Sequence, residues 1–339
     1  MDTKNEGQIK RSLQTRHLSM IALGGSIGTG LFIASGSAIT TAGPGGALIA
    51  YGVMGIMVYF LMTSLAEMAT YIPLTGSFAA YAGKFVSPAL GFALGWNYWF
   101  NAAITVPVEI TTVGLVMNFW FPHVPAWMFS GVIFLVIFII NYLSVRSYGE
   151  TEFWLALIKV LAVVAFLIVG VLVIFGIMGG QAPIGMRNFT YKDAPFVHGV
   201  PGIISVFLVA GFSFQGTEMI GIAAGESANP EKSVPEAIKS TFWRILLFYI
   251  LTIFVIAVIL PYTNKNLLSA DVQDIVTSPF TLVFQRAGLA AAASVMNAVI
   301  LVAVLSAANS WMYASTRMLY SQARGGYAGK IFGIVNKRG

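Results

Sequence analysis

The sequence predicts an all-α polytopic membrane protein. Hydrophobic residues make up 57% and charged residues only 9% of the 339 residues, whereas soluble domains carry about 25% charged residues. The mean hydropathy is +0.81. Apolar stretches of membrane-spanning length recur along the chain, and two of them are interrupted by clusters of glycine, serine and threonine.

The predicted spans follow from apolar stretches near the roughly 20 residues that cross a bilayer. They fall approximately at residues 17–40, 45–70, 89–118, 127–145, 153–178, 201–224, 242–261 and 289–316. An even number of spans places both termini on one side of the membrane.

Basic residues predict that this side is the cytoplasm. Most of the 19 lysines and arginines then lie inside, as the positive-inside rule requires. The exceptions are Lys159, within a span, and the external Arg187, Lys192, Lys265 and Arg286. The net charge of +6 is scattered over short loops rather than gathered on one face, which argues against nucleic acid as a partner.

The first span contains the run GGSIGTG, Gly24 to Gly30. Each glycine inside a helix costs roughly 1 kcal/mol against alanine, and a broken backbone in lipid leaves polar groups unpaired. A chain tolerates this where the groups face protein, water or a ligand. The run therefore predicts a broken helix beside a binding site, as in transporters; close packing of helices through small residues is the alternative.

The sixth span carries a second such cluster, GFSFQGTE, Gly211 to Glu218. Interrupted helices at corresponding positions of two halves are typical of inverted-repeat transporters with a site at the membrane midplane. Amides at Ser26 to Gly30 suit a carboxylate, and carbonyls near Ala210 to Ser213 suit an ammonium group. A zwitterionic amino acid needs both, so an amino acid is the expected substrate.

Several runs resemble the amino acid permeases of the amino acid–polyamine–organocation superfamily. They are Arg16–Phe32, Pro73–Phe78, Gly91–Trp99 and Ala314–Tyr320. Gly211–Ser227 and Phe242–Tyr249 look most similar to the lysine-specific branch. The resemblance implies proton-driven uptake of an amino acid, with L-lysine expected, in the bacterial inner membrane.

The resemblance also implies a leucine-transporter-type fold of two inverted five-helix repeats with broken first and sixth helices. We expect a cytoplasmic tail over 1–16, a first repeat over 17–180, a second repeat over 201–318 and a cytoplasmic tail over 319–339. The second repeat is incomplete, because the sequence ends after the eighth helix and the family has about ten to twelve. A product that does not transport alone is therefore an alternative.

The same resemblance assigns site residues. It places the substrate carboxylate on the backbone of the first break and the amine and side chain on the second, with a lysine of the fifth helix in the place of a sodium ion. The corresponding residues are Ser26, Ile27, Gly28, Thr29 and Gly30 in the first break, Ser213, Gln215 and Glu218 in the second, and Lys159.

Charged residues within spans are expensive and are functional candidates by default. Glu218 is expected to pair with a substrate amine or to take up the coupled proton. Its alternative role is that of a protonated carboxyl whose hydrogen bonds only stabilise the broken helix. Lys159 is expected to change charge during proton coupling; the alternative is that its stem reaches the inner interface. For Glu109, in the third helix, substrate contact and a structural role are equally expected.

Other charged residues fit ordinary roles better. Glu67 and Glu226 lie at cytoplasmic span ends, where a solvated face or a contact to Arg146 or Arg244 is favoured over gating. Asp271 and Asp274 fit a solvated external loop, with attraction of a cationic substrate as the alternative.

For the polar stripe of the eighth helix, a structural role is slightly favoured over a role in lining the transport pathway. It comprises Asn297, Ser306, Asn309, Ser310 and Ser315. The histidines His17, His123 and His198 are far apart and predict no metal site.

Other function classes find little support. The chain lacks a phosphate-binding loop, which argues against ATP-driven transport, and it shows neither a catalytic cluster nor a cofactor motif, so an enzyme is not expected. The expected partners are an amino acid, the proton and membrane lipid. An amino-acid sensor that signals through a regulatory membrane partner is the alternative function.

Overall fold

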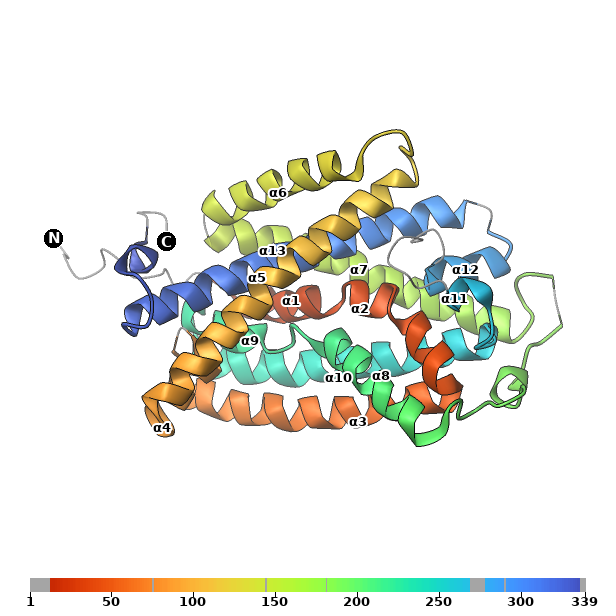
Figure 1. The fold of residues 1–339 in the computed structure, drawn as a ribbon, viewed down its shortest axis with the longest axis horizontal. Coiled ribbons are helices and arrows are strands. Elements are labelled where there is room, and N and C mark those ends of the chain that lie inside the picture. The colour runs from red at the N-terminus through yellow and green to blue at the C-terminus, as the bar shows by residue number, and fades with distance from the viewer. Residues whose placement is uncertain are drawn as a thin grey trace.

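The computed structural model describes residues 13–74, 76–143, 145–180, 182–268, 278–289 and 291–335. Within these ranges the chain is helical (Figure 1), and its one β-type feature is an isolated bridge between Leu13 and Ser227. The helices are α1 (Thr15–Ser26), α2 (Thr29–Phe32), α3 (Ser35–Tyr71), α4 (Ser77–Phe85), α5 (Pro88–Asn118), α6 (Ala126–Leu143), α7 (Val145–Ile174), η1 (Arg187–Phe189), α8 (Gly199–Phe214), α9 (Met219–Ala223), η2 (Ala224–Glu226), α10 (Pro230–Ile259), α11 (Lys265–Leu268), α12 (Pro279–Arg286), α13 (Ala292–Arg324) and η4 (Lys330–Gly333).

The chain is an all-α polytopic membrane protein, as predicted. Six helical segments of the described chain are long and apolar enough to span a membrane. The other two predicted spans are also helical. The first is divided between α1, α2 and the start of α3, and the seventh lies within α10, a helix of 30 residues.

Two boundaries differ from the sequence prediction. Helix α3 continues from the first predicted span into the second across a kink at Gly43, whose φ of 77° is left-handed. A side chain there would meet the Pro195 carbonyl, because a built Cβ lies 2.6 Å from that oxygen. Helix α7 begins at Val145 instead of residue 153, so Glu150 and Glu152 belong to the helix rather than to a loop.

Both expected helix breaks are present. Helix α1 ends at Ser26 and α2 starts at Thr29, while α8 ends at Phe214 and α9 starts at Met219. The two broken helices run in opposite directions across the molecule (Figure 1). This antiparallel arrangement is the one expected of the first and sixth helices of an inverted repeat; the repeat boundaries themselves stay a prediction.

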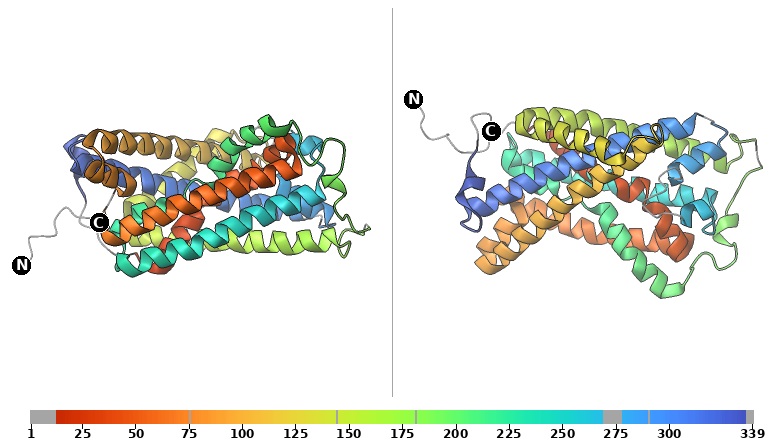
Figure 2. Two further views of the ribbon diagram at one scale, coloured as in Figure 1. Left: turned by 90° about the horizontal axis from the view of Figure 1, so that it is seen from below. Right: turned by 45° about the horizontal axis from the view of Figure 1, so that its top comes forward.

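The helices pack in two groups around the breaks. Helix α3 packs along α8 and α10, and α5 packs along α13 and α6. The broken helix α1 contacts α7, α10 and α13, so it lies between the groups. The right view of Figure 2 shows α5 and α13 crossing in front of α3 and α10.

Candidate functional site

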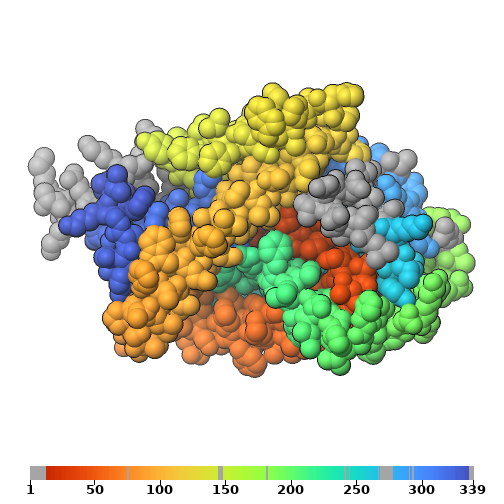
Figure 3. All heavy atoms as spheres, viewed as in Figure 1, coloured from red at the N-terminus to blue at the C-terminus, as the bar shows by residue number. Residues whose placement is uncertain are grey.

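A cavity of about 530 Å³ lies between the two helix groups. Its walls come from α3, from Phe78 of α4, from α5 and from the second break. Apolar side chains dominate the α3 wall, including Met54, Met57 and Met68, and the opposite wall contributes Tyr98 and polar groups. The space-filling view shows a hollow between α3, α5 and α8 (Figure 3). An apolar pocket with a few polar groups is the usual form of a small-molecule site.

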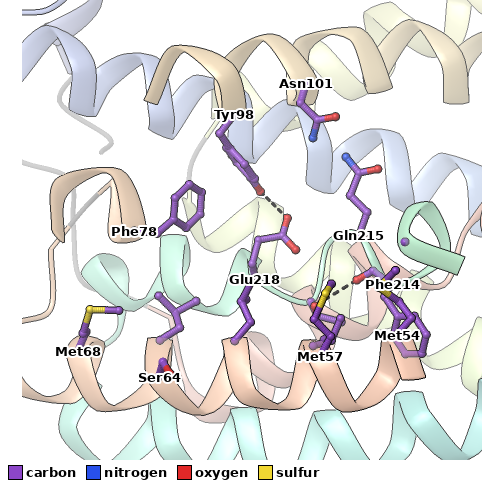
Figure 4. Close-up of a pocket in the computed structure, with 15 residues that line it drawn as sticks. Met54, Met57, Ser64, Met68, Phe78, Tyr98, Asn101, Phe214, Gln215 and Glu218 are labelled. Carbon is purple, nitrogen blue, oxygen red and sulfur yellow. Dashed lines mark hydrogen bonds between the residues drawn. The ribbon is translucent and has the colours of Figure 1, made fainter. Parts of the chain in front are cut away.

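Glu218 is the charged residue of this cavity. Its Oε1 accepts a hydrogen bond from the Tyr98 hydroxyl at 2.8 Å, and its Oε2 accepts one from the Gly216 amide at 2.9 Å. The side chain projects between α5 and α3, and the amides of Gln215 and Asn101 approach one another beside it (Figure 4). The carboxyl therefore braces the second break and faces the cavity at once, so both roles expected for it are compatible with its position.

The first break lies outside the cavity lining. Ser26, Ile27 and Thr29 are buried, and none of the predicted residues from Ser26 to Gly30 lines the cavity. Two amides that were expected to face a ligand bond within the break instead: Ile27 donates to Leu23 at 3.0 Å and Gly28 donates to Ser26 at 3.1 Å. The first amides of α2 begin at Thr29 and have no acceptor within the helix.

The two breaks touch through their backbones. A Cβ built on Gly216, whose φ is 101°, would lie 2.5 Å from the carbonyl carbon of Gly25, so this contact requires glycine. Tyr249 of α10 ties the breaks together, because its hydroxyl contacts the carbonyls of Ser26, at 2.7 Å, and of Ser213. The Ser213 hydroxyl is itself buried against that of Tyr51, at 2.9 Å.

Lys159 is fully buried and holds the carbonyl end of α1. Its Nζ donates to the carbonyls of Gly24 and Ile27, the latter at 2.9 Å. The alternative of a side chain that reaches the inner interface is therefore wrong. An ammonium beside the carbonyl end of a helix is electrostatically favourable.

Glu109 is buried beside the first break. Its Oε1 accepts from the Thr29 hydroxyl at 3.0 Å. A Cβ on Gly28 would lie 3.3 Å from the same oxygen, so the backbone of the break passes close to this carboxyl. The structure thus brings Glu109 to the first break and leaves it away from the cavity lining.

A buried carboxyl that the sequence prediction missed is Glu152 of α7. It accepts hydrogen bonds from the Ser306 hydroxyl and, at 3.0 Å, from the Asn309 amide of α13. The polar stripe of the eighth helix thus binds neighbouring helices, and its Ser310 lies 3.4 Å from the Tyr148 hydroxyl. Glu152 precedes Lys159 by seven residues, a spacing that places both on one helix face and could have identified it.

The other charged candidates are placed as follows. Glu226 is fully buried and pairs with Arg317 of α13 at 2.7 Å, so the expected solvated face is wrong, while the side chains of Arg146 and Arg244 lie outside the described part of the structure. Glu67 is exposed, as expected. Asp271 and Asp274 lie outside the described residues.

Interrupted helices that meet between two helix groups, beside a cavity with a carboxylate in its wall, define a membrane transporter of the broken-helix type. The family follows from comparison: residues 17–339 match the amino acid permease family, and the chain belongs to it. The chain is a transporter and not an enzyme.

Curated relatives support the same assignment. The chain is 57% identical over 331 residues to lysine-specific permease LysP of Escherichia coli, across 98% of this chain and 68% of that protein. It is 56% identical over 336 residues to histidine permease HisP of Lactococcus lactis, across 99% of this chain and 70% of that protein. LysP of Lactococcus lactis is 57% identical over 344 residues, across 100% of this chain and 67% of that protein. The chain thus spans about two thirds of these relatives.

Proposed function

We propose that the chain imports a cationic amino acid, L-lysine, into the cell by proton symport. The observation that carries this proposal is the position of Glu218, whose carboxyl is the charged group of a cavity with a mainly apolar lining. A cationic side chain there gains a charge-assisted hydrogen bond. Relatives named for lysine and for histidine are almost equally similar to the chain, so identity supports a basic amino acid and the site chemistry must select lysine.

The balance of charge at the breaks supports a cationic substrate. Among the described residues at the two breaks there is one ammonium, Lys159, and there are three buried carboxyls: Glu109 and Glu152, which interact electrostatically with Lys159, and Glu218 in the second break. Glu226 is already paired with Arg317. Uncompensated charge within the membrane is costly. A substrate that brings a positive side chain, or a proton that neutralises a carboxyl, lowers that cost, so both fit the same site.

The substrate carboxylate is assigned to the first break. The amides of Thr29 and Gly30 open helix α2, and such amides favour an anion. In the present conformation Thr29 is buried and Gly30 lies against Ser213 of α8, since a Cβ built on Gly30 would be 2.7 Å from the Ser213 Cα. We infer that the two helix groups move relative to one another, which separates the breaks and admits the carboxylate. Motion of this kind is the general mode of transporters built around a fixed midplane site.

The proposed membrane topology has both termini in the cytoplasm of a bacterial cell. The described residues nearest both termini lie at one end of the bundle, together with α4 and its Lys84 (Figure 1). The external assignments Arg187, Lys265 and Arg286 lie on elements at the opposite end. This separation agrees with the positive-inside rule for the bacterial inner membrane.

Uptake by reconstituted protein tests the proposal. Proteoliposomes that contain the purified chain should accumulate labelled lysine only when a proton gradient is imposed, and a proton ionophore should abolish accumulation. Unlabelled lysine should compete best, followed by arginine and histidine, with aromatic amino acids and γ-aminobutyrate weakest. Binding without accumulation would contradict transport and favour an amino-acid sensor. Accumulation that ignores the proton gradient would contradict symport.

A further inference from the structure

The buried carboxyl of Glu152 has no part in the substrate cavity, yet it shares a backbone contact with Lys159. Both residues lie on α7, and both reach Gly24 of the first break. Lys159 binds the Gly24 carbonyl, and a Cβ built on Gly24 would fall 1.8 Å from Glu152 Oε1. The Gly24 peptide is therefore enclosed by an ammonium and a carboxyl that interact electrostatically.

Polar side chains lead away from Glu152 toward one end of the bundle. Glu152 Oε2 accepts from the Asn309 amide at 3.0 Å, and Asn309 Oδ1 accepts from the Asn141 amide at 2.8 Å. Asn141 lines a separate cavity of about 450 Å³, bounded by the end of α13 and by η4. That end carries both described termini and is cytoplasmic in the proposed topology. The route does not pass through the substrate cavity.

Other titratable groups lie on the helices packed around this route. The elements around Glu152 contribute Tyr148 and Lys159 of α7, His17 of α1, Glu109 of α5, Tyr249 of α10, Arg286 of α12, Tyr313 and Arg317 of α13 and Glu226 of η2. Arg317 pairs with Glu226, and Arg286 bonds to the carbonyl of Ile259 at 2.9 Å. The Lys159 ammonium is the charge that acts on Glu152.

We propose that Glu152 is a second proton-exchange residue, which takes the proton of Lys159 through an intervening water and releases it to water that enters from the cavity lined by Asn141; the carboxamides of Asn309 and Asn141 hold that water and carry no proton themselves. Transfer of one proton from the ammonium to the carboxylate leaves both groups neutral. Release to water restores the carboxylate, and Lys159 is recharged by a proton from the external side. The loss of the ammonium frees the carbonyls of Gly24 and Ile27, which loosens the first break. The proposal rests on the proposed proton symport and assigns the proton a path apart from the substrate.

Cysteine labelling tests Glu152 independently of transport, because the natural chain contains no cysteine. A parent variant Ser64→Cys carries one thiol in the wall of the substrate cavity. Its rate of maleimide labelling is measured in proteoliposomes from pH 5.5 to 8. The matched control is Glu150→Gln on the same helix, since Glu150 is partly exposed and contacts Arg16 at 2.7 Å and His17 at 3.3 Å instead of Lys159. Because all variants carry the same thiol, comparing their labelling rates at each pH cancels the effect of pH on the ionisation of that thiol.

We expect the labelling rate of the parent and of the Glu150→Gln variant to depend on pH in the same way. The labelling rate of the Glu152→Gln variant should not show this pH dependence. Asn141→Leu should slow the response without abolishing it, and it provides the test if Glu152→Gln fails to fold. Retention of the parental pH dependence in Glu152→Gln would overturn the proposal. A parent without pH dependence, or equal loss in Glu150→Gln, would overturn it as well.

Lysine flux separates this inference from the proposed function. In Glu152→Gln, proton-driven net uptake should fall about tenfold or more, which corresponds to ~1.4 kcal/mol, while exchange of internal for external lysine continues. Net uptake and exchange that fall together would assign Glu152 a structural role and overturn the inference. Failure of the parent to accumulate lysine contradicts the proposed symport, whereas the labelling result still decides the role of Glu152.

Discussion

The two helix breaks share a glycine-rich sequence but differ in what they face. The first is buried, and its carbonyls are occupied by Lys159 and Tyr249. The second exposes Gln215 and Glu218 to a cavity. The difference shows that glycine content locates a break, whereas the charged side chains around it decide whether the break is held closed or offered to a ligand.

Substitution at the contact between the two breaks should have the largest effect on the stability of the protein. Gly216→Ala places a methyl against the backbone of Gly25 at a left-handed φ of 101°, a conformation that alanine rarely adopts. We expect loss of folded protein, or a destabilisation of about 3 kcal/mol or more. Thermal unfolding in detergent measures it. Gly52→Ala is the control, because a Cβ there meets nothing within 4 Å; an equal effect of both variants would contradict the contact argument.

The charge of the second break should matter more for the substrate than for the fold. Glu218→Gln keeps the shape and removes the negative charge; its oxygen can still accept from the Gly216 amide, while its NH2 would have to donate to the Tyr98 hydroxyl. We expect lysine affinity to fall about tenfold or more, as for loss of a charge-assisted hydrogen bond. Equilibrium binding of labelled lysine measures it. Tyr98→Phe, which keeps the charge, should weaken binding less; a Glu218→Gln variant with parental affinity would remove Glu218 from the substrate site.

Tyr249, which joins the two breaks, should matter more for the stability of the fold than for substrate binding. Tyr249→Phe removes the hydroxyl that contacts the carbonyls of Ser26 and Ser213. Leaving buried acceptors unpaired costs about 1–3 kcal/mol, so the melting temperature should fall. Tyr59→Phe on the exposed side of α3 is the control. A melting temperature unchanged by Tyr249→Phe would show that the breaks are held by other contacts.

Much of the fold could be predicted because burial in lipid imposes length and apolarity on each span. The two breaks were also predictable, since a dense glycine cluster at membrane depth disfavours a continuous helix and leaves backbone groups that need a partner. The start of α7 was not, because Glu150 and Glu152 look like loop residues until partners on another helix are known. Ser306 and Asn309 lie more than 150 positions away in the chain.

The site was predictable only in part, for the same physical reason. Glu218 and Lys159 stand out as charges within apolar segments, and the structure places both at the breaks. Tyr98 and Tyr249 do not stand out, because tyrosine is common in membrane helices and only its partner defines its role. The pair of Glu226 and Arg317 joins residues 91 positions apart, beyond the reach of helical spacing.

The smallest effect should come from the neutral polar group of the second break. Gln215 lines the cavity beside Glu218, and its amide faces that of Asn101 (Figure 4). Gln215→Ala removes one neutral hydrogen-bonding group, which is worth about 0.5–1.5 kcal/mol. We expect a several-fold loss of lysine affinity at unchanged melting temperature, measured by the same binding assay.

Selectivity makes this last variant informative. If Gln215 helps to distinguish basic side chains, competition by arginine and histidine should change relative to lysine, while Asn101→Ala gives a matched comparison from the opposite wall. A fall in melting temperature without any change in affinity would instead group Gln215 with Tyr249, as a residue that holds the breaks together. The second break would then contact the substrate through Glu218 and not through Gln215.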